Sequence, residues 1–243
     1  MARHPGDASH VNLATLPLAL LLFTAPFTSA QSAQNFLATY KGTPYTDSHH
    51  PIGAQAIPGK VECAFYDRGG EGIAYHDTDA KNNGSGGLNP KDGTYLNEFR
   101  MNEGVDTSYT KFHDPNVPID NNPYDLVQPP PDQLYVGWTE PGEWFNLTVN
   151  VAHAGIYTPD FHYTSNRGGS ISIDVNGKPA GAPINIPSTF STAEPIAWRQ
   201  WHHWNLLPHA TTLQLLAGKN VLTVHIVTGG QMNLATFDFK DAK

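Results

Sequence analysis

The stretch LYVGWTEPGEWFNLTVNVAHAGIYTPDFHYTSN, residues 134–166, contains two segments in which apolar and polar side chains alternate. The apolar positions of the two segments are, in order, Phe145, Leu147, Val149, Val151, Tyr157, Phe161 and Tyr163. Side chains on a strand point to opposite faces in turn, so each segment has one apolar face and one polar face. We therefore predict a hairpin that turns at Ala154-Gly155 and forms the middle of a β-sandwich.

The same two-residue period continues along the chain. We expect a first strand at 60–66 and further strands at 170–175, 182–186, 213–215, 222–226 and 232–239. The chain holds 22 Gly and 20 Pro, which suits many turns and short strands. About eight or nine strands at spacings of roughly 8–12 residues predict an all-β fold, a β-sandwich or barrel.

Composition excludes several classes of partner. The net charge is −8 and no basic cluster is present, so we expect no nucleic acid and no anionic membrane surface as partner. Cys63 is the only cysteine and cannot form an internal disulfide. We predict that it is a small buried hydrophobe on a strand.

The chain divides into three parts. Residues 1–30 have a basic start and a short apolar run, which predicts a cleaved signal peptide and a secreted protein, extracellular or on the cell surface. After cleavage no membrane partner is expected. Residues 31–56 are predicted to be an irregular, loosely ordered leader. Residues 57–243 form the module, and the Gly-rich and Pro-rich stretch at about 76–133 is predicted to be a long loop insertion.

Six segments in series resemble a known family. They are IPGKVECAFYDRGGEGIAYHDTD, EFRMNEGVD, VGWTEPGEWFNLTVNVAHAGIYT, AWRQW, LLAGKNVLTVHIVTGG and MNLATFDF, which together span about residues 57–240. This pattern resembles carbohydrate-binding module family 6 and its close relative family 35. The resemblance implies a jelly-roll sandwich of the galactose-binding-domain type. It also implies a module that binds plant or algal polysaccharides and commonly accompanies a glycoside hydrolase.

The resemblance also implies a binding site. Family 6 modules hold a sugar between two aromatic rings, above an Asn of the last strand, and the matching residues here are Trp138, Trp198 and Asn233. The physical chemistry agrees, because an aromatic plane suits the C–H face of a sugar and an amide both donates and accepts at its rim. Strand parity with Phe237 predicts that Asn233 points inward, at the mouth of the sandwich. The family's second Asn is Ala235 here.

The remaining aromatic candidates are expected at the rim of the cleft, in the packing or on the outer sheet. We expect Tyr75 and His76, from the sequence AYHD, to line the rim of the cleft. Trp201 and Trp204 are expected to be packing residues. Trp144 has the parity of the polar face, so it either covers the outer sheet under a loop or marks a second site there.

The resemblance further implies a structural calcium ion. Glu62 matches the family's first acidic residue and Asp238 matches the acid near the end of the module, while Ala64 replaces the second acid. Calcium prefers several carboxylate and carbonyl oxygens, so the two acids are the candidate ligands.

We therefore predict non-catalytic binding of a polysaccharide. The alternative is a glycan-active enzyme on the same scaffold, either a glycoside hydrolase or a metal-dependent oxidase. Glu140, Glu143 and Asp106 are the acids near the Trp138 turn that a hydrolase could use. A purely structural cell-surface module is the third class. The chain has 12 histidines, but it contains no HExxH element, and no Cys–His spacing suits zinc.

Overall fold

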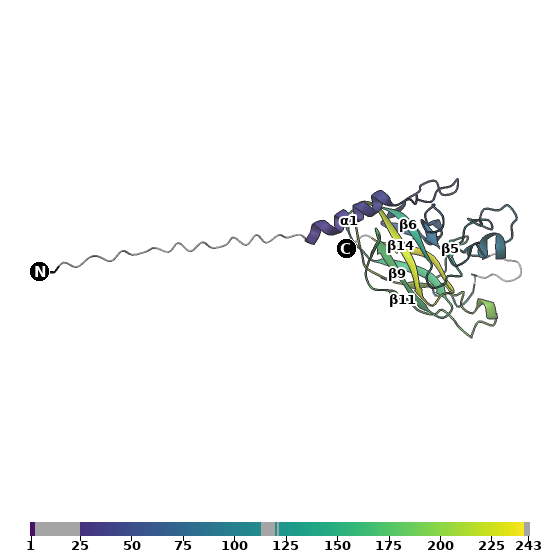
Figure 1. Cartoon of the computed structure of the whole chain (residues 1–243). Helices are drawn as coiled ribbons and strands as arrows, with labels where there is room; N and C mark the ends of the chain where they lie inside the picture. Colours follow the sequence, from purple (N-terminus) through teal and green to yellow (C-terminus); the bar gives the residue numbers. More distant parts are fainter. Residues whose placement is uncertain (3–24, 113–119, 121, 241–243) are drawn as a thin grey trace.

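The protein is a β-sandwich, as predicted. A computed structural model describes residues 1–2, 25–112, 120 and 122–240. Two sheets lie face to face (Figure 1). The seven-stranded sheet has the order β1-β6-β14-β9-β10, with β3 beside β6 and β11 beside β9. Its strands are β1 (Gln55–Ile57), β3 (Tyr75–His76), β6 (Trp144–Val151), β9 (Gly169–Val175), β10 (Lys178–Pro179), β11 (Ile184–Ile186) and β14 (Gly218–Thr228).

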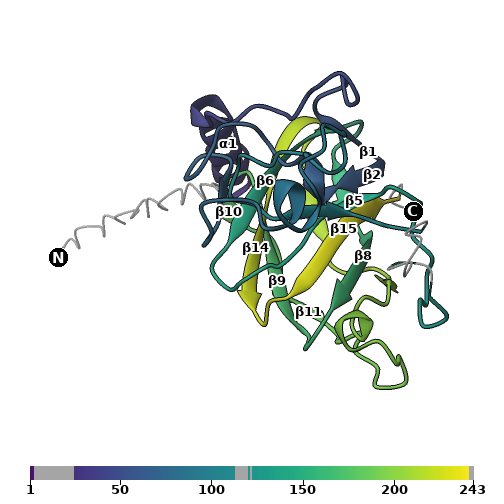
Figure 2. The same ribbon diagram turned by 90° about the vertical axis from the view of Figure 1, so that its right-hand side faces the viewer.

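The six-stranded sheet has the order β12-β8-β15-β5-β4, with β2 beside β15. Its strands are β2 (Gly59–Glu62), β4 (Thr107–Tyr109), β5 (Leu134–Val136), β8 (Pro159–Ser165), β12 (Asn205–Leu207) and β15 (Met232–Phe239). A small third sheet pairs β7 (Gly155–Tyr157) with β13 (Leu213–Leu215). Figure 2 shows β8, β15 and β5 side by side, with β6, β14 and β9 in the other layer.

The two strands predicted as a hairpin lie in opposite sheets, so that prediction is wrong. β6 pairs with β14 over eight residues, and β8 pairs with β15 and β12. The reason is the one-sided character of both strands. Two amphipathic strands in opposite layers can bury their apolar faces against each other, and this stacking encloses more apolar surface than placing them side by side.

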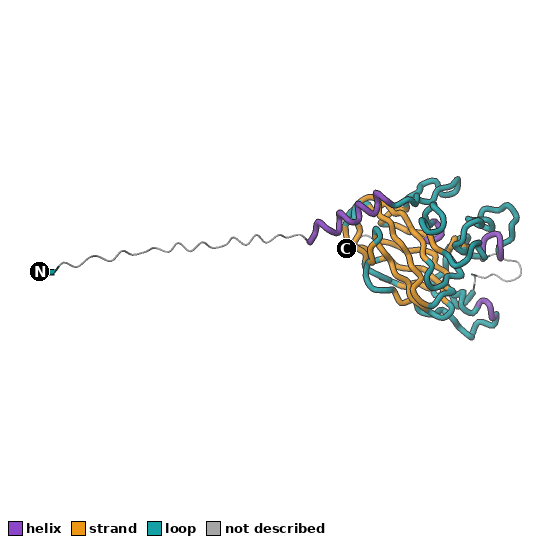
Figure 3. The backbone as a smooth tube through the Cα atoms, in the orientation of Figure 1, coloured by secondary structure: helices purple, strands orange, loops and turns teal. Residues whose placement is uncertain are grey.

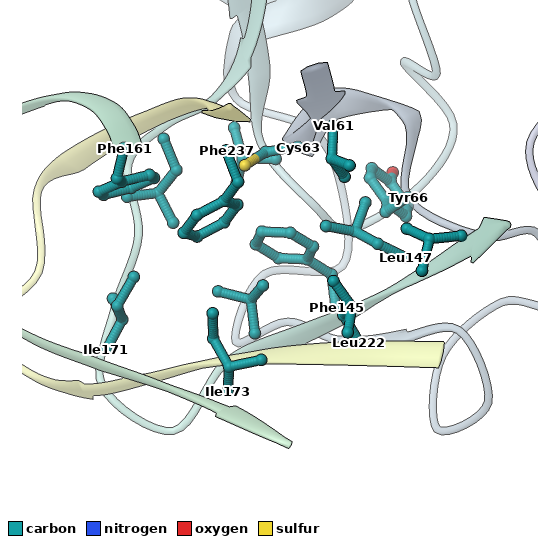
Figure 4. Packing of buried hydrophobic residues seen from close by; sticks show 14 of the residues in the cluster. Val61, Cys63, Tyr66, Phe145, Leu147, Phe161, Ile171, Ile173, Leu222 and Phe237 are labelled. Atoms are coloured by element: carbon teal, nitrogen blue, oxygen red, sulfur yellow. The ribbon is translucent and has the colours of Figure 1, made fainter. Parts of the chain in front are cut away.

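The core fills the space between the sheets (Figure 4). Phe161 of β8 and Phe237 of β15 stack with ring centroids 4.4 Å apart. Leu147 of β6 and Ile171 of β9 are fully buried on the facing layer. Cys63 is also buried, as predicted, and burial raises the pKa of its thiol. It lies in a short 3-10 helix, η1 (Cys63–Phe65), which replaces the end of the predicted first strand.

Residues 31–39 of the predicted leader are helical where we expected an irregular segment, whereas residues 40–54 form no helix or strand. Helix α1 (Ala25–Thr39) crosses the predicted cleavage boundary at residue 30, and Phe36 and Tyr40 stack one turn apart. A Cβ atom on Gly177 would lie 2.4 Å from the Phe36 ring, so the ring is docked on the β9–β10 turn. The Tyr40 hydroxyl donates to buried Asp67 at 2.7 Å. Within the described residues, no helix has the length and apolar character needed to cross a membrane.

The long insertion is also packed onto the sandwich. Phe99 joins Tyr45, Ala64 and Leu134 in a second apolar cluster beside η1. The adjoining turn 84–88 bonds to β4 through Ser85 Oγ and the Thr107 carbonyl oxygen at 3.2 Å. Residues 113–119 and 121 of the predicted insertion lie outside the described residues. The loops gather at the end of the sandwich away from α1 (Figure 3), and this loop end carries the candidate site.

Candidate functional site

Asn233 lies on the outer face of the six-stranded sheet. The register of β15 against β8 shifts between Leu234 and Thr236, so Ala235 is an extra, unpaired residue. This bulge shifts the alternation of side chains along the strand by one residue. Leu234 before the bulge and Phe237 after it both point into the core, so Asn233, next to Leu234, points outward. The predicted inward direction of Asn233 is therefore wrong. The side chain is nevertheless only 1% exposed, because loops cover it.

Gly137 and His202 hold the amide of Asn233 in place. A Cβ atom on Gly137 would lie 2.9 Å from Asn233 Oδ1, so the close approach of β5 requires glycine. On the other side, Asn233 Nδ2 lies 3.5 Å from His202 Nδ1. The amide is thus a fixed polar group between two elements. The sequence did not single out His202 as a candidate.

Two tryptophans surround His202. Its ring centroid lies 4.0 Å from that of Trp201 and 6.4 Å from that of Trp198, with the Trp198 ring nearly perpendicular to it. Trp198 lies in a short 3-10 helix, η3 (Ala197–Arg199), and is 49% exposed. Trp204 is fully buried against Tyr135 and donates to Asp120, as expected of a packing residue. The loop therefore presents Trp198 to solvent above a polar floor.

Trp138 lies on the other side of Asn233. It follows β5 with φ of 49°, a left-handed conformation that is uncommon outside glycine. Its half-buried ring lies against Gly84, where a Cβ atom would approach it to 2.9 Å. In the sheet, β15 has β5 on one side and β8 on the other, and η3 leads into β12, which pairs with the far edge of β8. The structure thus brings Trp138, Asn233 and Trp198 to one end of one sheet.

A buried ion pair fixes the loop that carries Trp198. Glu194 accepts from Arg199 Nε at 2.9 Å and Nη2 at 3.0 Å, and from the Ile196 N–H at 3.0 Å. Burial acts to raise the pKa of the Glu194 carboxyl, but these hydrogen bonds outweigh burial and lower it. A bidentate pair of this kind is stronger and more directional than a single hydrogen bond. It holds η3 in one geometry.

His202 is neutral at pH 7. Burial, with a smaller repulsion from His203, lowers the pKa of His202 to about 4. A neutral imidazole has one N–H donor and one acceptor nitrogen. Together with the amide of Asn233, it offers donors and acceptors of the kind that pair with hydroxyl groups.

Tyr75 does not belong to this set of residues. It lies in the core, its ring 5.5 Å from that of Tyr66, and its hydroxyl accepts from the Gly104 N–H at 3.3 Å. The rim prediction fails because β3 pairs with β6 and turns Tyr75 inward. His76, the next residue, points to the outer face of the seven-stranded sheet and bonds to Glu71 at 2.5 Å. Neither residue joins Asn233, which is on the other sheet.

Trp144 lies in a row across the outer face of the seven-stranded sheet. It pairs with His76 of β3 on one side and with His225 of β14 on the other. Its side chain is half-buried. A second binding site at Trp144 stays a prediction.

Glu62 and Asp238 lie on the outer face of the six-stranded sheet. In the register of β2 with β15, Glu62 is opposite Thr236, whereas Asp238 is opposite Lys60. One carboxylate oxygen of Glu62 accepts from Gln133 Nε2 at 3.1 Å. Ala64, at the position of the family's second acid, is buried in apolar surroundings.

Calcium needs about six to eight oxygen ligands. The described residues contain no group of three or more His, Cys, Asp or Glu side chains placed to hold a metal ion. Glu62 and Asp238 therefore do not form a calcium site by themselves, and calcium binding stays a prediction.

The acids near the Trp138 turn do gather. Burial and the neighbouring carboxylates raise the pKa of Asp77 to about 7 and of Asp106 to about 6, and burial raises the pKa of Glu143. Asp77 and Glu143 line a small cavity of about 10 Å³. That space admits roughly one water molecule and is too small for a sugar ring.

These raised pKa values predict a pH-dependent stability. An acid whose pKa is higher in the folded state stabilises the fold at low pH, and this contribution is lost as pH rises from about 4 through the folded pKa, about 7 for Asp77. Asp77→Asn keeps an acceptor for the Asp79 N–H and removes the charge. We expect the melting temperature of the variant, relative to the wild type, to rise by several degrees between pH 5 and pH 8.

Thermal unfolding monitored at several pH values measures this difference. Asp132→Asn, which removes one charge at an exposed position, is the control. A difference for Asp77→Asn that stays constant across the pH range would show that Asp77 does not carry the shift.

The comparisons with known proteins give similarity in structure. No protein-family model and no curated protein matches the sequence. A family 35 carbohydrate-binding module from Clostridium thermocellum has 24% identity and a TM-score of 0.36, and covers 45% of this chain and 78% of that one. The family 6 module CBM6cm-2 of Cellvibrio mixtus lichenase 5A, solved with cellotriose, has 24% identity and a TM-score of 0.36 over 45% and 79%.

An enzyme also appears among the similar structures. A glycoside hydrolase family 43 arabinoxylan arabinofuranohydrolase from Bacillus subtilis has 12% identity and a TM-score of 0.44, and covers 82% of this chain but 33% of that one. Each of these three structures is less than 25% identical to this chain and has a TM-score below 0.5.

Proposed function

We propose that the protein binds a polysaccharide without catalysis, in a cleft between Trp198 and Trp138. One observation carries the proposal. A 49% exposed indole, Trp198, packs near the partly buried, neutral imidazole of His202, and His202 in turn contacts the buried amide of Asn233. A sugar ring has an apolar C–H face, which suits the indole, and a rim of hydroxyls, which suits the imidazole that Asn233 orients.

His202, which Asn233 orients, is the polar group that would give the cleft its selectivity. Asn233 and His202 are held by neighbouring groups before any ligand arrives, so little side-chain entropy is lost on binding. A neutral imidazole also keeps a positive charge out of the floor of the cleft. We therefore expect binding to be insensitive to pH between about 6 and 8 as far as His202 is concerned.

Retention on insoluble polysaccharides tests the proposal. We expect the protein to be depleted from solution by at least one of a set of cellulose, other insoluble glucans and insoluble xylans, and a glycan array then identifies the repeating unit. The assay is run with and without a calcium chelator, which also tests the predicted calcium ion. Failure to bind any glycan in either condition would contradict the proposal.

The alternative function is a glycan-active enzyme. The gathering of Asp77, Asp106 and Glu143 beside the Trp138 turn favours it, because raised pKa values suit a general acid. The cavity that Asp77 and Glu143 line weighs against an enzyme, because its volume of about 10 Å³ is too small for a sugar ring. Release of soluble sugars from a retained polysaccharide by the purified protein would establish the enzyme and overturn the non-catalytic proposal.

We also propose that the protein is secreted and acts outside the cell, on its own or beside a separate glycoside hydrolase. The apolar run that ends near Ala30 supports this proposal. N-terminal sequencing of protein recovered from the culture medium is the test, with Gln31 as the expected first residue. Protein that stays in the cell with residues 1–30 intact would contradict secretion.

A further inference from the structure

Three turns at the loop end line an open groove of about 390 Å³. They join β5 to β6, β8 to β9 and β14 to β15, and they contribute residues 139–141, Arg167 and residues 229–231. The volume lies within the roughly 300–1,000 Å³ of small-molecule sites in proteins. Apart from Glu140, none of these residues was a candidate from sequence.

Two of the residues that line the groove are close in sequence to residues of the proposed cleft. Thr139 follows Trp138, and Gln231 lies two residues before Asn233. The Gln231 N–H donates to the Thr139 carbonyl oxygen at 2.7 Å, and the Met232 N–H donates to Thr139 Oγ1 at 3.1 Å. One hydrogen-bonded unit therefore forms both the wall of the groove and the support of the cleft.

The backbone of the β14–β15 turn is held close to the β5–β6 turn. Gly230 has φ of 118°, and a Cβ atom there would lie 2.7 Å from the Thr139 carbonyl oxygen. Gln231, with φ of 51°, accepts a hydrogen bond from Asn166 Nδ2 at 2.6 Å. A left-handed residue that is not glycine persists only where its surroundings determine it. The groove is thus a preformed feature of the fold.

The chemistry of the groove suits neutral hydroxyl groups. Its exposed side chains include one cation, Arg167, one anion, Glu140, and one amide, Gln231. These groups supply both donors and acceptors with no net charge. The protein carries a net charge of −8 and the acidic residues Asp77 and Glu143 nearby, which disfavours an acidic polysaccharide.

We propose that this groove is a second subsite, which binds the next sugar residues of a neutral polysaccharide chain whose first contact is the cleft. The inference rests on the proposed function of the cleft. It implies that the protein recognises several consecutive sugars within a chain, rather than a single sugar.

Calorimetry with a length series of neutral oligosaccharides tests the subsite. The series runs from the monosaccharide to the hexasaccharide of the glycan retained in the binding assay. We expect the affinity of the wild type to rise with length beyond the unit that fills the cleft. Arg167→Ala and Glu140→Gln should each lower the affinity for the hexasaccharide about 10-fold and leave that for the shortest ligand unchanged, since a hydrogen bond to a charged group contributes on this order.

Lys178→Ala, an exposed change on β10, is the control and should behave as the wild type. Affinity that does not depend on length, or hexasaccharide binding unchanged in both groove variants, overturns the subsite and leaves the proposed function standing. Tighter binding of an acidic oligosaccharide of equal length overturns the neutral class. Absence of binding by the wild type at every length overturns the proposed function as well.

Discussion

Trp198→Ala is expected to lower the affinity for the retained polysaccharide about 30-fold or more. In the proposed cleft the indole is the exposed aromatic plane, and truncating a central aromatic anchor typically costs about 2 kcal/mol or more, which is roughly 30-fold. The side chain is 49% exposed, so the free energy of unfolding should change little. Calorimetric titration gives the affinity, and thermal unfolding of the same samples confirms that the variant is folded.

Phe190→Ala is the matched control for Trp198→Ala. Phe190 lies in the same loop and is 45% exposed. A hydrogen bond from the Ser191 N–H to the Gln200 carbonyl oxygen connects the two ends of this loop. It does not belong to the set around Asn233 and His202. We expect its removal to leave affinity within twofold of the wild type. Equal losses for both variants would indicate general loop packing, and no loss for Trp198→Ala would mean that the cleft is elsewhere.

Arg100→Met is expected to reduce the free energy of unfolding by about 3–5 kcal/mol, which is the usual effect of removing one partner from a buried ion pair. The Arg100 side chain is 3% exposed and donates to Glu103 from Nη2 at 2.8 Å. It also donates to the carbonyl oxygens of Asp67 and Tyr66 and lies 3.3 Å from the centroid of the Tyr66 ring. Arg100 therefore joins the insertion to the sandwich.

Chemical denaturation measures this loss, and the melting temperature should fall by roughly 10 °C. Arg68→Met is the control, because Arg68 also lies over an aromatic ring, 4.7 Å from the Tyr45 centroid, but is exposed. Its effect should stay within about 0.5 kcal/mol. The double variant Arg100→Met, Glu103→Gln should recover part of the loss, since it removes the carboxylate left unpaired. Similar values for Arg68→Met and Arg100→Met would contradict the role assigned to Arg100.

The alternation of apolar and polar residues was sufficient to predict the position of a strand where the strand's own sequence determines which face is buried. β15 spans Met232–Phe239, the residues predicted for the last strand, and β9 and β14 also lie where alternation predicted strands. The predicted sandwich is confirmed for the same reason. Each strand carries one apolar face, and many short strands of this kind can enclose a core only by stacking in two layers.

Local pattern failed where a distant partner decided the outcome. Parity along β15 put Asn233 on the inner face, but the bulge at Ala235 arises from the pairing with β8 and moves it to the outer face. The expected hairpin is absent, because β6 finds its long partner in β14, about seventy residues further along the chain. The irregular leader became ordered because Phe36 and Tyr40 dock on β9–β10 and on Asp67.

The candidate site combines both kinds of information. The resemblance to family 6 singled out Trp138, Trp198 and Asn233 as candidate sugar ligands, and their aromatic planes and planar amide suit that role. Tertiary structure alone decided that His202 joins them, that Tyr75 is in the core, and that a groove of about 390 Å³ adjoins the cleft. The physical reason is that alternation and propensity act over a few residues, whereas a binding surface depends on which loops meet at the end of two sheets.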